Sequence, residues 1–140
     1  MIPFAPAERD ELIRNVWGEA RGEPDAGRAG VAWVHVNRVA APSWWGHSLG
    51  EVCLKPFQFS CRNAGDPNLP KLLALDPGGA DYVSIARIVE GVLKGTIPDP
   101  TGGATHYKVT GTRASWDKAA ARVTPVVIGR HSFYKLGPSA

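Results

Sequence analysis

The chain has 140 residues, of which 44% are hydrophobic, and its 16 Lys and Arg against 13 Asp and Glu give a formal net charge of +3. This length and composition predict one compact domain over residues 1–140, with loops rich in its 16 glycines and 12 prolines. The positive charge is spread without a Lys/Arg block or a recognised reader motif, which argues against nucleic acid as a partner.

The first 20 residues do not resemble an export signal, because the charged run Glu8–Glu11 stands where the apolar centre of a signal would lie. No apolar run reaches the length of a transmembrane helix. We therefore expect a protein that is made in the cytoplasm without an ordinary signal peptide and does not insert stably into a membrane. We also expect it to be a monomer.

Residues 6–20 are predicted to form the first helix. Gly22 and Pro24 are expected to end it. The apolar side chains that recur at helical spacing are Leu12, Ile13, Val16 and Ala20.

Glu19 lies in the last turn of this predicted helix and is the candidate catalytic residue. A carboxylate at that place faces the negative end of the helix dipole, and Trp17 nearby is expected to desolvate it. Both influences favour the protonated form, which a general acid needs near neutral pH. Taken alone, however, a glutamate in a last helical turn is most often a solvated surface group.

Residues 25–39 fit two structures. Their β-branched alternation suits a strand, but their length and the Pro24-Asp25 start favour a helix, which is our prediction. Asn37 and Arg38 at its end are read as capping or pairing residues. The residues expected on one side, close to the first helix, are Ala26, Ala29, Gly30 and Trp33.

Trp44 and Trp45 follow in a loop rich in Pro, Ser and Gly. Two such rings either fill the edge of the core or stack on a ligand. The next residues, Ser48–Glu51, match a capping box and predict a short helix that ends near Lys55.

The segment Phe57–Cys61 places Gln58 and Ser60 between aromatic side chains. An amide and a hydroxyl in that setting suit the wall of a sugar-binding groove, although the two phenylalanines would equally suit a core. Residues 62–71 are rich in Asn, Asp, Gly and Pro and are predicted to form an irregular surface loop.

The C-terminal half begins with the clearest helical pattern, over residues 76–94, with Gly95 as its C-terminal cap. Residues 104–109 alternate as in a strand, and residues 123–134 predict two more short strands around the Gly129-Arg130 turn. The sequence therefore predicts an α+β fold with a helical core and a small antiparallel β element in the C-terminal third.

Cys53 and Cys61 are close enough in sequence to form a small disulfide in an oxidising compartment, and they would stay reduced in the cytosol. The four histidines are scattered, so we expect neither a metal site nor a cofactor. They are His35, His47, His106 and His131.

Five short motifs occur in a fixed order along the chain: GEARGE at 18–23, NRV at 37–39, QFSC at 58–61, GATHY at 103–107 and IGRHSFY at 128–134. With these motifs the sequence resembles the cell-wall hydrolase family of the spore-cortex-lytic enzymes SleB and CwlJ, from about residue 10 to about residue 135. The departures from the family pattern are Trp17, His35 and Lys108, and none of them removes a carboxylate.

The resemblance implies a lysozyme-like α+β domain that cleaves the glycan strand of peptidoglycan between N-acetylmuramic acid and N-acetylglucosamine. It assigns the essential carboxylate to Glu19, which would act as acid and then as base toward the muramic acid 6-hydroxyl, giving a 1,6-anhydro product. Hydrolysis through a water held by Ser60 or Thr105 is the alternative, and Glu23 is read as a cap or an orienting partner. The residues predicted to bind substrate are Glu23, Trp45, Gln58, Ser60, Thr105, His106, Tyr107 and Tyr134.

The sequence carries no peptidoglycan-binding repeat, so we expect a phage endolysin that reaches the wall in the periplasm after release. Two rival hypotheses stay open. One is a zinc amidase or peptidase built from His35, His106 or His131 with an acidic residue, and the other is a non-catalytic wall-binding module.

Overall fold

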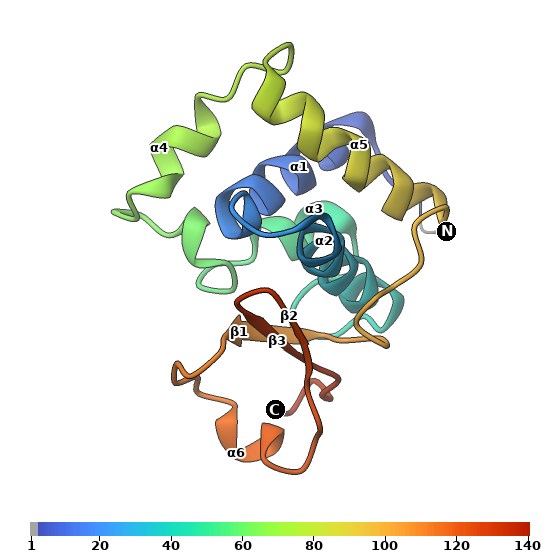
Figure 1. Ribbon diagram of the computed structural model, residues 1–140, viewed down its shortest axis with the longest axis vertical. Helices are drawn as coiled ribbons and strands as arrows, with labels where there is room; N and C mark the ends of the chain where they lie inside the picture. The colour runs from blue at the N-terminus through green and yellow to red at the C-terminus, as the bar shows by residue number, and fades with distance from the viewer. Residues whose placement is uncertain (1–2) are drawn as a thin grey trace.

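Two consecutive helices, α1 and α2, form the centre of the structure, a computed structural model that describes residues 3–140. The other long helix, α5, packs on both of them, and a small sheet lies below the helices with the C-terminal segment (Figure 1). The elements are α1 (Pro6–Ala20), α2 (Asp25–Ala40), α3 (Leu49–Leu54), η1 (Ser60–Arg62), α4 (Asn68–Leu73), α5 (Ala80–Lys94), β1 (His106–Val109), α6 (Asp117–Ala120), β2 (Val126–Ile128) and β3 (His131–Tyr134).

Helix α1 has the predicted bounds. Pro6 opens it, and the backbone N–H of Ala5 donates to the Glu8 carboxylate over 2.9 Å, which satisfies a donor at the helix start. Its predicted apolar stripe is buried, so the helix presents that face to the core.

Helix α2 confirms the helical interpretation of residues 25–39. It contacts α1, α3, α5 and β1, and therefore buries side chains around most of its circumference. That burial explains why its sequence lacks a clear amphipathic period and resembles a strand. Ala26 is exposed, so it does not share the buried side predicted for it.

The sheet has the order β1-β3-β2, and both pairs are antiparallel. It packs on α2 through Phe133, which is 1% exposed. A Cβ atom at Gly30 would lie 2.9 Å from Cζ of Phe133, so only glycine allows this close approach. The predicted α+β class, with its β element in the last third of the chain, is confirmed.

Three helices differ from prediction. Residues 62–71 are not all loop, because α4 begins at Asn68, whose backbone N–H donates to the Asp66 carboxylate over 2.8 Å. Helix α5 begins at Ala80 rather than at residue 76, although Gly95 caps it at φ 75° as expected. The four-residue helix α6 is too short to leave a periodic signal.

The two cysteines are both buried and both free, so the disulfide considered from the sequence is absent between these two described residues. Burial raises the pKa of both thiols well above the usual range. Within residues 3–140, no helix has the length and apolar character needed to cross a membrane.

Candidate active site

Glu19 lies in the last turn of α1 and lines a groove of about 510 Å³ between the helices and the sheet. Its Oε1 atom accepts a hydrogen bond from the Tyr107 hydroxyl on β1 at 2.7 Å. Its Oε2 atom accepts a longer one from the Ser60 hydroxyl on η1 at 3.4 Å. Three elements distant in sequence therefore meet at one carboxylate.

The surroundings of Glu19 favour its protonated form. Burial is the main cause that raises the pKa of this carboxyl above its usual value, and the nearby negative charge of Asp66 raises it further. Hydrogen bonds from Tyr107, Ser60 and the Cys61 thiol oppose this shift without cancelling it. The direction agrees with the sequence prediction.

Trp17 does not supply the predicted desolvation. Its ring packs instead under the guanidinium of Arg21, at 4.2 Å from ring centroid to Cζ. Side chains two positions apart point to different sides of a helix, so Trp17 and Glu19 face different neighbours.

Gly18 allows η1 to approach Glu19. A Cβ atom at this position would lie 2.8 Å from Cβ and 2.9 Å from Sγ of Cys61, closer than packed side chains come. Since Cys61 follows Ser60 in η1, the absence of a side chain at Gly18 brings the Ser60 hydroxyl within reach of the carboxylate.

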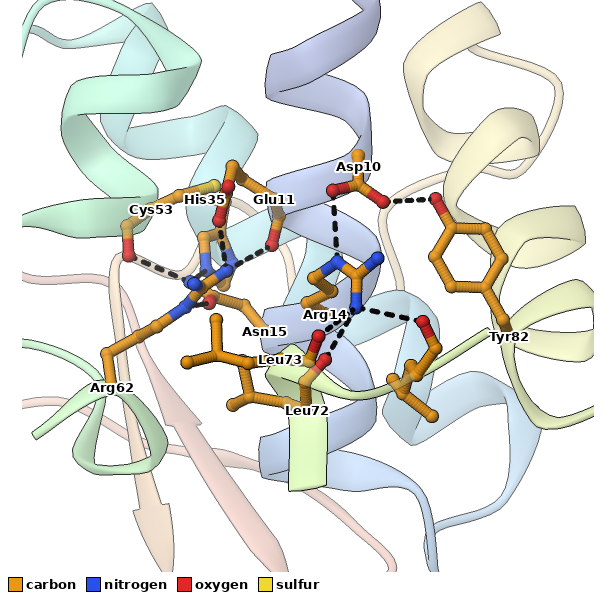
Figure 2. A network of polar contacts seen from close by, with 11 residues as sticks. Asp10, Glu11, Arg14, Asn15, His35, Cys53, Arg62, Leu72, Leu73 and Tyr82 are labelled. Atoms are coloured by element: carbon orange, nitrogen blue, oxygen red, sulfur yellow. Dashed lines mark hydrogen bonds and ion pairs between the residues drawn. The ribbon is translucent and has the colours of Figure 1, made fainter. Parts of the chain in front are cut away.

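A buried polar network holds the far end of η1 (Figure 2). Arg62 donates from Nε to Oδ1 of Asn15 at 2.5 Å and forms an ion pair with Glu11, also at 2.5 Å. The Asn15 amide nitrogen in turn contacts Nε2 of His35 at 3.1 Å and donates to the Cys53 carbonyl at 3.0 Å. The network thus joins η1 to α1, α2 and α3.

A second set of contacts in Figure 2 anchors α4 to α1. Arg14 donates from Nη1 to the carbonyls of Leu72 at 2.7 Å and Leu75 at 3.2 Å, at the end of α4. Asp10 accepts from Arg14 and from the Tyr82 hydroxyl of α5. The chain from η1, whose Ser60 contacts Glu19, to the end of α4 is therefore anchored at both ends.

Arg38, at the end of α2, also lines the groove that contains Glu19. It is 5% exposed and donates to the Thr105 carbonyl at 2.8 Å and to Oε1 of Gln58 at 3.2 Å. Burial lowers the pKa of Arg38 to about 10, so it stays charged at neutral pH. Its contact fixes the amide of Gln58, a predicted binding residue that does line the groove.

The structure contradicts the predicted role of Trp45 in substrate binding. Its side chain is 1% exposed, and its Nε1 donates to the Arg38 carbonyl at 2.9 Å, so no ligand can stack on it. The neighbouring Trp44 is 45% exposed and lines the groove instead. The sequence offered both rings in one loop, and their burial depends on the chain path around them.

The structure also contradicts the predicted role of Thr105 in binding substrate or a reacting water. Its hydroxyl donates to the Leu136 carbonyl at 2.7 Å and accepts from the Leu136 backbone N–H at 3.1 Å. It ties the C-terminal segment to β1 and does not line the groove, so it is not placed to hold a reacting water.

His106 and Tyr134 occupy different places around Trp116, a groove residue that the sequence prediction missed. His106 lines the groove with little exposed surface, and burial together with the Arg38 charge lowers its pKa to about 4, so it is neutral. Tyr134 packs edge-on against Trp116 at 5.2 Å without lining the groove, which corrects its predicted role. A lone tryptophan in a polar segment was the available signal for Trp116.

The two phenylalanines on either side of Gln58 both border the groove but differ in burial. Phe59 is 2% exposed, whereas Phe57 is 82% exposed. Phe57 adopts a left-handed backbone conformation with φ 63°, which is strained for a residue with a large side chain. This conformation turns its ring outward.

Glu23, a predicted binding residue, contacts the turn between β2 and β3 and does not line the main groove. Its Oε1 accepts from the Arg130 backbone N–H at 2.8 Å and lies 3.5 Å from Nδ1 of His131, and the residue is 9% exposed. It borders a second hollow of about 300 Å³ that also contains Glu19, Asn68 and Arg130. Glu19 therefore stands where the groove and this second hollow meet.

The three histidines of the zinc hypothesis do not form one ligand set. His35 is buried in the core, with Nδ1 on the Val31 carbonyl at 2.8 Å and its ring stacked on Phe59. Over residues 3–140, no three His, Cys, Asp or Glu side chains are grouped as metal ligands would be.

The sequence is similar to a known protein family and to spore cortex-lytic enzymes. Residues 22–134 match the cell wall hydrolase family, a segment that begins just after Glu19. A spore cortex-lytic enzyme of Halalkalibacterium halodurans is 33% identical over 123 residues, which are 87% of this chain and 33% of that enzyme. One from Bacillus cereus is 29% identical over 137 residues, 96% of this chain and 47% of that enzyme. The chain thus spans between a third and a half of the length of these relatives.

Two solved structures share the fold. The catalytic domain of SleB from Bacillus cereus matches with a TM-score of 0.74 and 26% identity, over 96% of this chain and 94% of that one. The catalytic domain of the germination-specific lytic transglycosylase SleB from Bacillus anthracis matches with a TM-score of 0.72 and 25% identity, over 96% and 100%. The lysozyme-like α+β fold expected from the motifs is confirmed.

Proposed function

The chain belongs to the cell wall hydrolase family, and from this premise we propose that it cleaves peptidoglycan between N-acetylmuramic acid and N-acetylglucosamine, with Glu19 as general acid and base. One observation carries the assignment. Of the residues in the described chain that line the groove, Glu19 alone is acidic, and its pKa is raised.

In the first step Glu19 donates its proton to the glycosidic oxygen, the bond from that oxygen to C1 of muramic acid breaks, and C1 gains oxocarbenium character. The raised pKa keeps a proton available for this step. Tyr107 holds Oε1 at 2.7 Å, so the other oxygen is the one placed to carry the proton.

In the second step the Glu19 carboxylate takes the proton of the muramic acid 6-hydroxyl, whose oxygen attacks C1. The products are a 1,6-anhydromuramic acid end and a free 4-hydroxyl, and Glu19 is protonated again. A single carboxylate suffices for this lytic transglycosylase route, whereas an inverting hydrolysis would need a second carboxylate to activate a water on the opposite face of the sugar. Glu23 is not free for that role, because it is buried and bound to the Arg130 backbone.

The groove suits a sugar polymer. Trp44, Phe57 and Trp116 line it with aromatic faces on which sugar rings can pack. Gln58, Ser60, His106 and Tyr107 contribute polar atoms along the same groove and are the proposed substrate contacts. The bacterial cell wall is accordingly the place of action, and the endolysin setting stays a prediction.

Mass spectrometry of digested, purified peptidoglycan tests this function. Anhydromuramic acid ends are expected, and their formation should be unaffected by EDTA. Reducing muramic acid ends would indicate hydrolysis, and freed peptides that disappear with EDTA and return with zinc would favour the amidase hypothesis. Binding to the wall without any soluble product would support the non-catalytic module.

A further inference from the structure

The positive charge of the chain is concentrated in its C-terminal lobe, residues 101–140. Six Lys and Arg side chains stand there against a single acidic one, Asp117, whereas the first 100 residues carry ten basic and 12 acidic side chains. This lobe contains the sheet (Figure 1). Its residues His106–Val109, Arg113–Trp116 and His131 line one side of the groove. The wall that faces a substrate is thus the cationic part of the molecule.

Most cations along the cleft already have partners. Arg38 is bound to Gln58 and the Thr105 carbonyl, and Lys108 forms an ion pair with Asp117 at 2.7 Å. Arg21 donates to Asn68 and covers Trp17.

Two exposed arginines, Arg113 and Arg130, differ from these cations because their guanidinium groups have no partner among residues 3–140. Arg113 lines the main groove, and Arg130 lines the second hollow on the other side of Glu19. Neither guanidinium forms an ion pair or hydrogen bond with any side chain or backbone group of residues 3–140. One free guanidinium therefore lies on each side of the proposed cleavage point.

We propose that Arg113 and Arg130 bind carboxylates of the peptide stems that muramic acid carries, so that the substrate is a peptide-bearing glycan strand. This inference rests on the proposed function. The glycan backbone is uncharged where its muramic acids carry stems, and the stem carboxylates are then its nearest anions. An arginine fork binds a carboxylate with two parallel hydrogen bonds, which a neutral sugar hydroxyl cannot match.

The position of the two arginines favours stems over other anions. A phosphate polymer or an anionic membrane would be attracted by the whole lobe, including Lys118 and Arg122, which line neither cavity. Arg113 and Arg130 instead border the two hollows that meet at Glu19, where bound muramic acid would direct its substituent.

The experiment compares three soluble, uncrosslinked substrates: strands with intact stems, strands with amidated stem carboxyls, and strands freed of stems by an amidase. Wild-type protein is expected to show a kcat/KM about tenfold higher on the first than on the other two, a preference that falls with added salt. The double variant Arg113→Gln/Arg130→Gln should lose that preference by raising KM on intact strands alone. Arg87→Gln on α5 removes one exposed charge far from the groove and should change nothing.

Equal wild-type rates on the three substrates would overturn the stem proposal while leaving glycan cleavage intact. It would also be overturned if the double variant lost activity equally on all three, or if Arg87→Gln had the same effect. Competition by phosphatidylglycerol vesicles against intact strands, abolished in the double variant, would assign the arginines to a membrane instead. Failure to cleave any of the strands would count against the proposed function itself.

Discussion

The hydroxyl of Tyr107 donates to Oε1 of Glu19 over 2.7 Å, joining β1 to the end of α1 across 88 residues. The same carboxylate stabilises the protonated phenol, since burial and the Glu19 charge raise the pKa of Tyr107 well above its usual value. Tyr107 is therefore a permanent donor to Glu19 and holds its carboxyl in one orientation.

This contact predicts a shift in pH dependence. A donor to a carboxylate stabilises the charged form, so Tyr107→Phe should raise the pKa of Glu19 and move the alkaline limb of kcat/KM to higher pH. Asp66→Asn removes a charge that raises this pKa and should move the limb to lower pH, while asparagine can still cap α4. The limb is measured in kcat/KM profiles, and shifts of both variants in one direction would contradict the account.

The close packing of η1 against Gly18 predicts that alanine substitutions at the two glycines of the GEARGE motif have different effects. Gly18→Ala should lower the free energy of unfolding by roughly 1–3 kcal/mol, because its Cβ meets Cys61 at 2.8 Å. It should also slow cleavage by displacing Ser60 from Glu19. Gly22→Ala is the matched control, since a Cβ there meets nothing within 4 Å. Urea unfolding and peptidoglycan clearing measure both effects, and equal results for the two variants would count against this packing.

The buried network predicts a large loss of stability on removing one member. Asn15→Leu leaves Nε of Arg62 and the Cys53 carbonyl without their hydrogen bonds, although Arg62 keeps its ion pair with Glu11, at a cost of about 2–4 kcal/mol in free energy of unfolding. Ser84→Ala, which removes an exposed hydroxyl within α5, should cost less than about 0.5 kcal/mol. A loss for Asn15→Leu as small as that of the control would show that the network is not structural.

The strained and exposed Phe57 predicts a defect in substrate binding without a defect in folding. Phe57→Ala should raise KM about tenfold through the loss of one ring contact, with little change in melting temperature, because the ring buries almost nothing in the free protein. Leu54→Ala removes a 50% exposed side chain outside the groove and should leave KM unchanged. An unchanged KM for Phe57→Ala would remove this ring from the substrate path.

The sequence predicted the helices and strands whose apolar spacing is local information. Helix α1, the Gly95 cap and the strands around Gly129 are examples. It failed where burial depends on distant contacts. Trp44 and Trp45 are equivalent in a sequence window, yet only the second is covered by the core.

The residues of the candidate site also fall into those that local sequence marks and those that only distant packing places. Glu19 is marked by its motif and helix end, but its partner Tyr107 is placed only by the packing of the sheet on α2. Thr105 shares the GATHY motif with Tyr107, and Tyr134 ends the IGRHSFY motif, yet neither lines the groove. Motif membership cannot tell which side of a strand faces the groove. Arg113 lies outside every motif.

Glu19 itself is expected to reduce stability at neutral pH. Its folded pKa is raised, so its contribution to stability is present at low pH and is lost as the pH rises through the folded pKa. Glu19→Gln keeps the shape without the charge and should melt at the same or a higher temperature than wild type at pH 7. A lower melting temperature would indicate that the carboxylate is satisfied better than its burial suggests.

The most direct test is the rate at which the folded Glu19→Gln variant releases soluble fragments from purified peptidoglycan. We predict a loss of at least about 10³-fold relative to wild type, with no anhydromuramic acid ends above background. A Glu19→Gln variant that retains its fold and releases such fragments at the wild-type rate would contradict the assignment of Glu19.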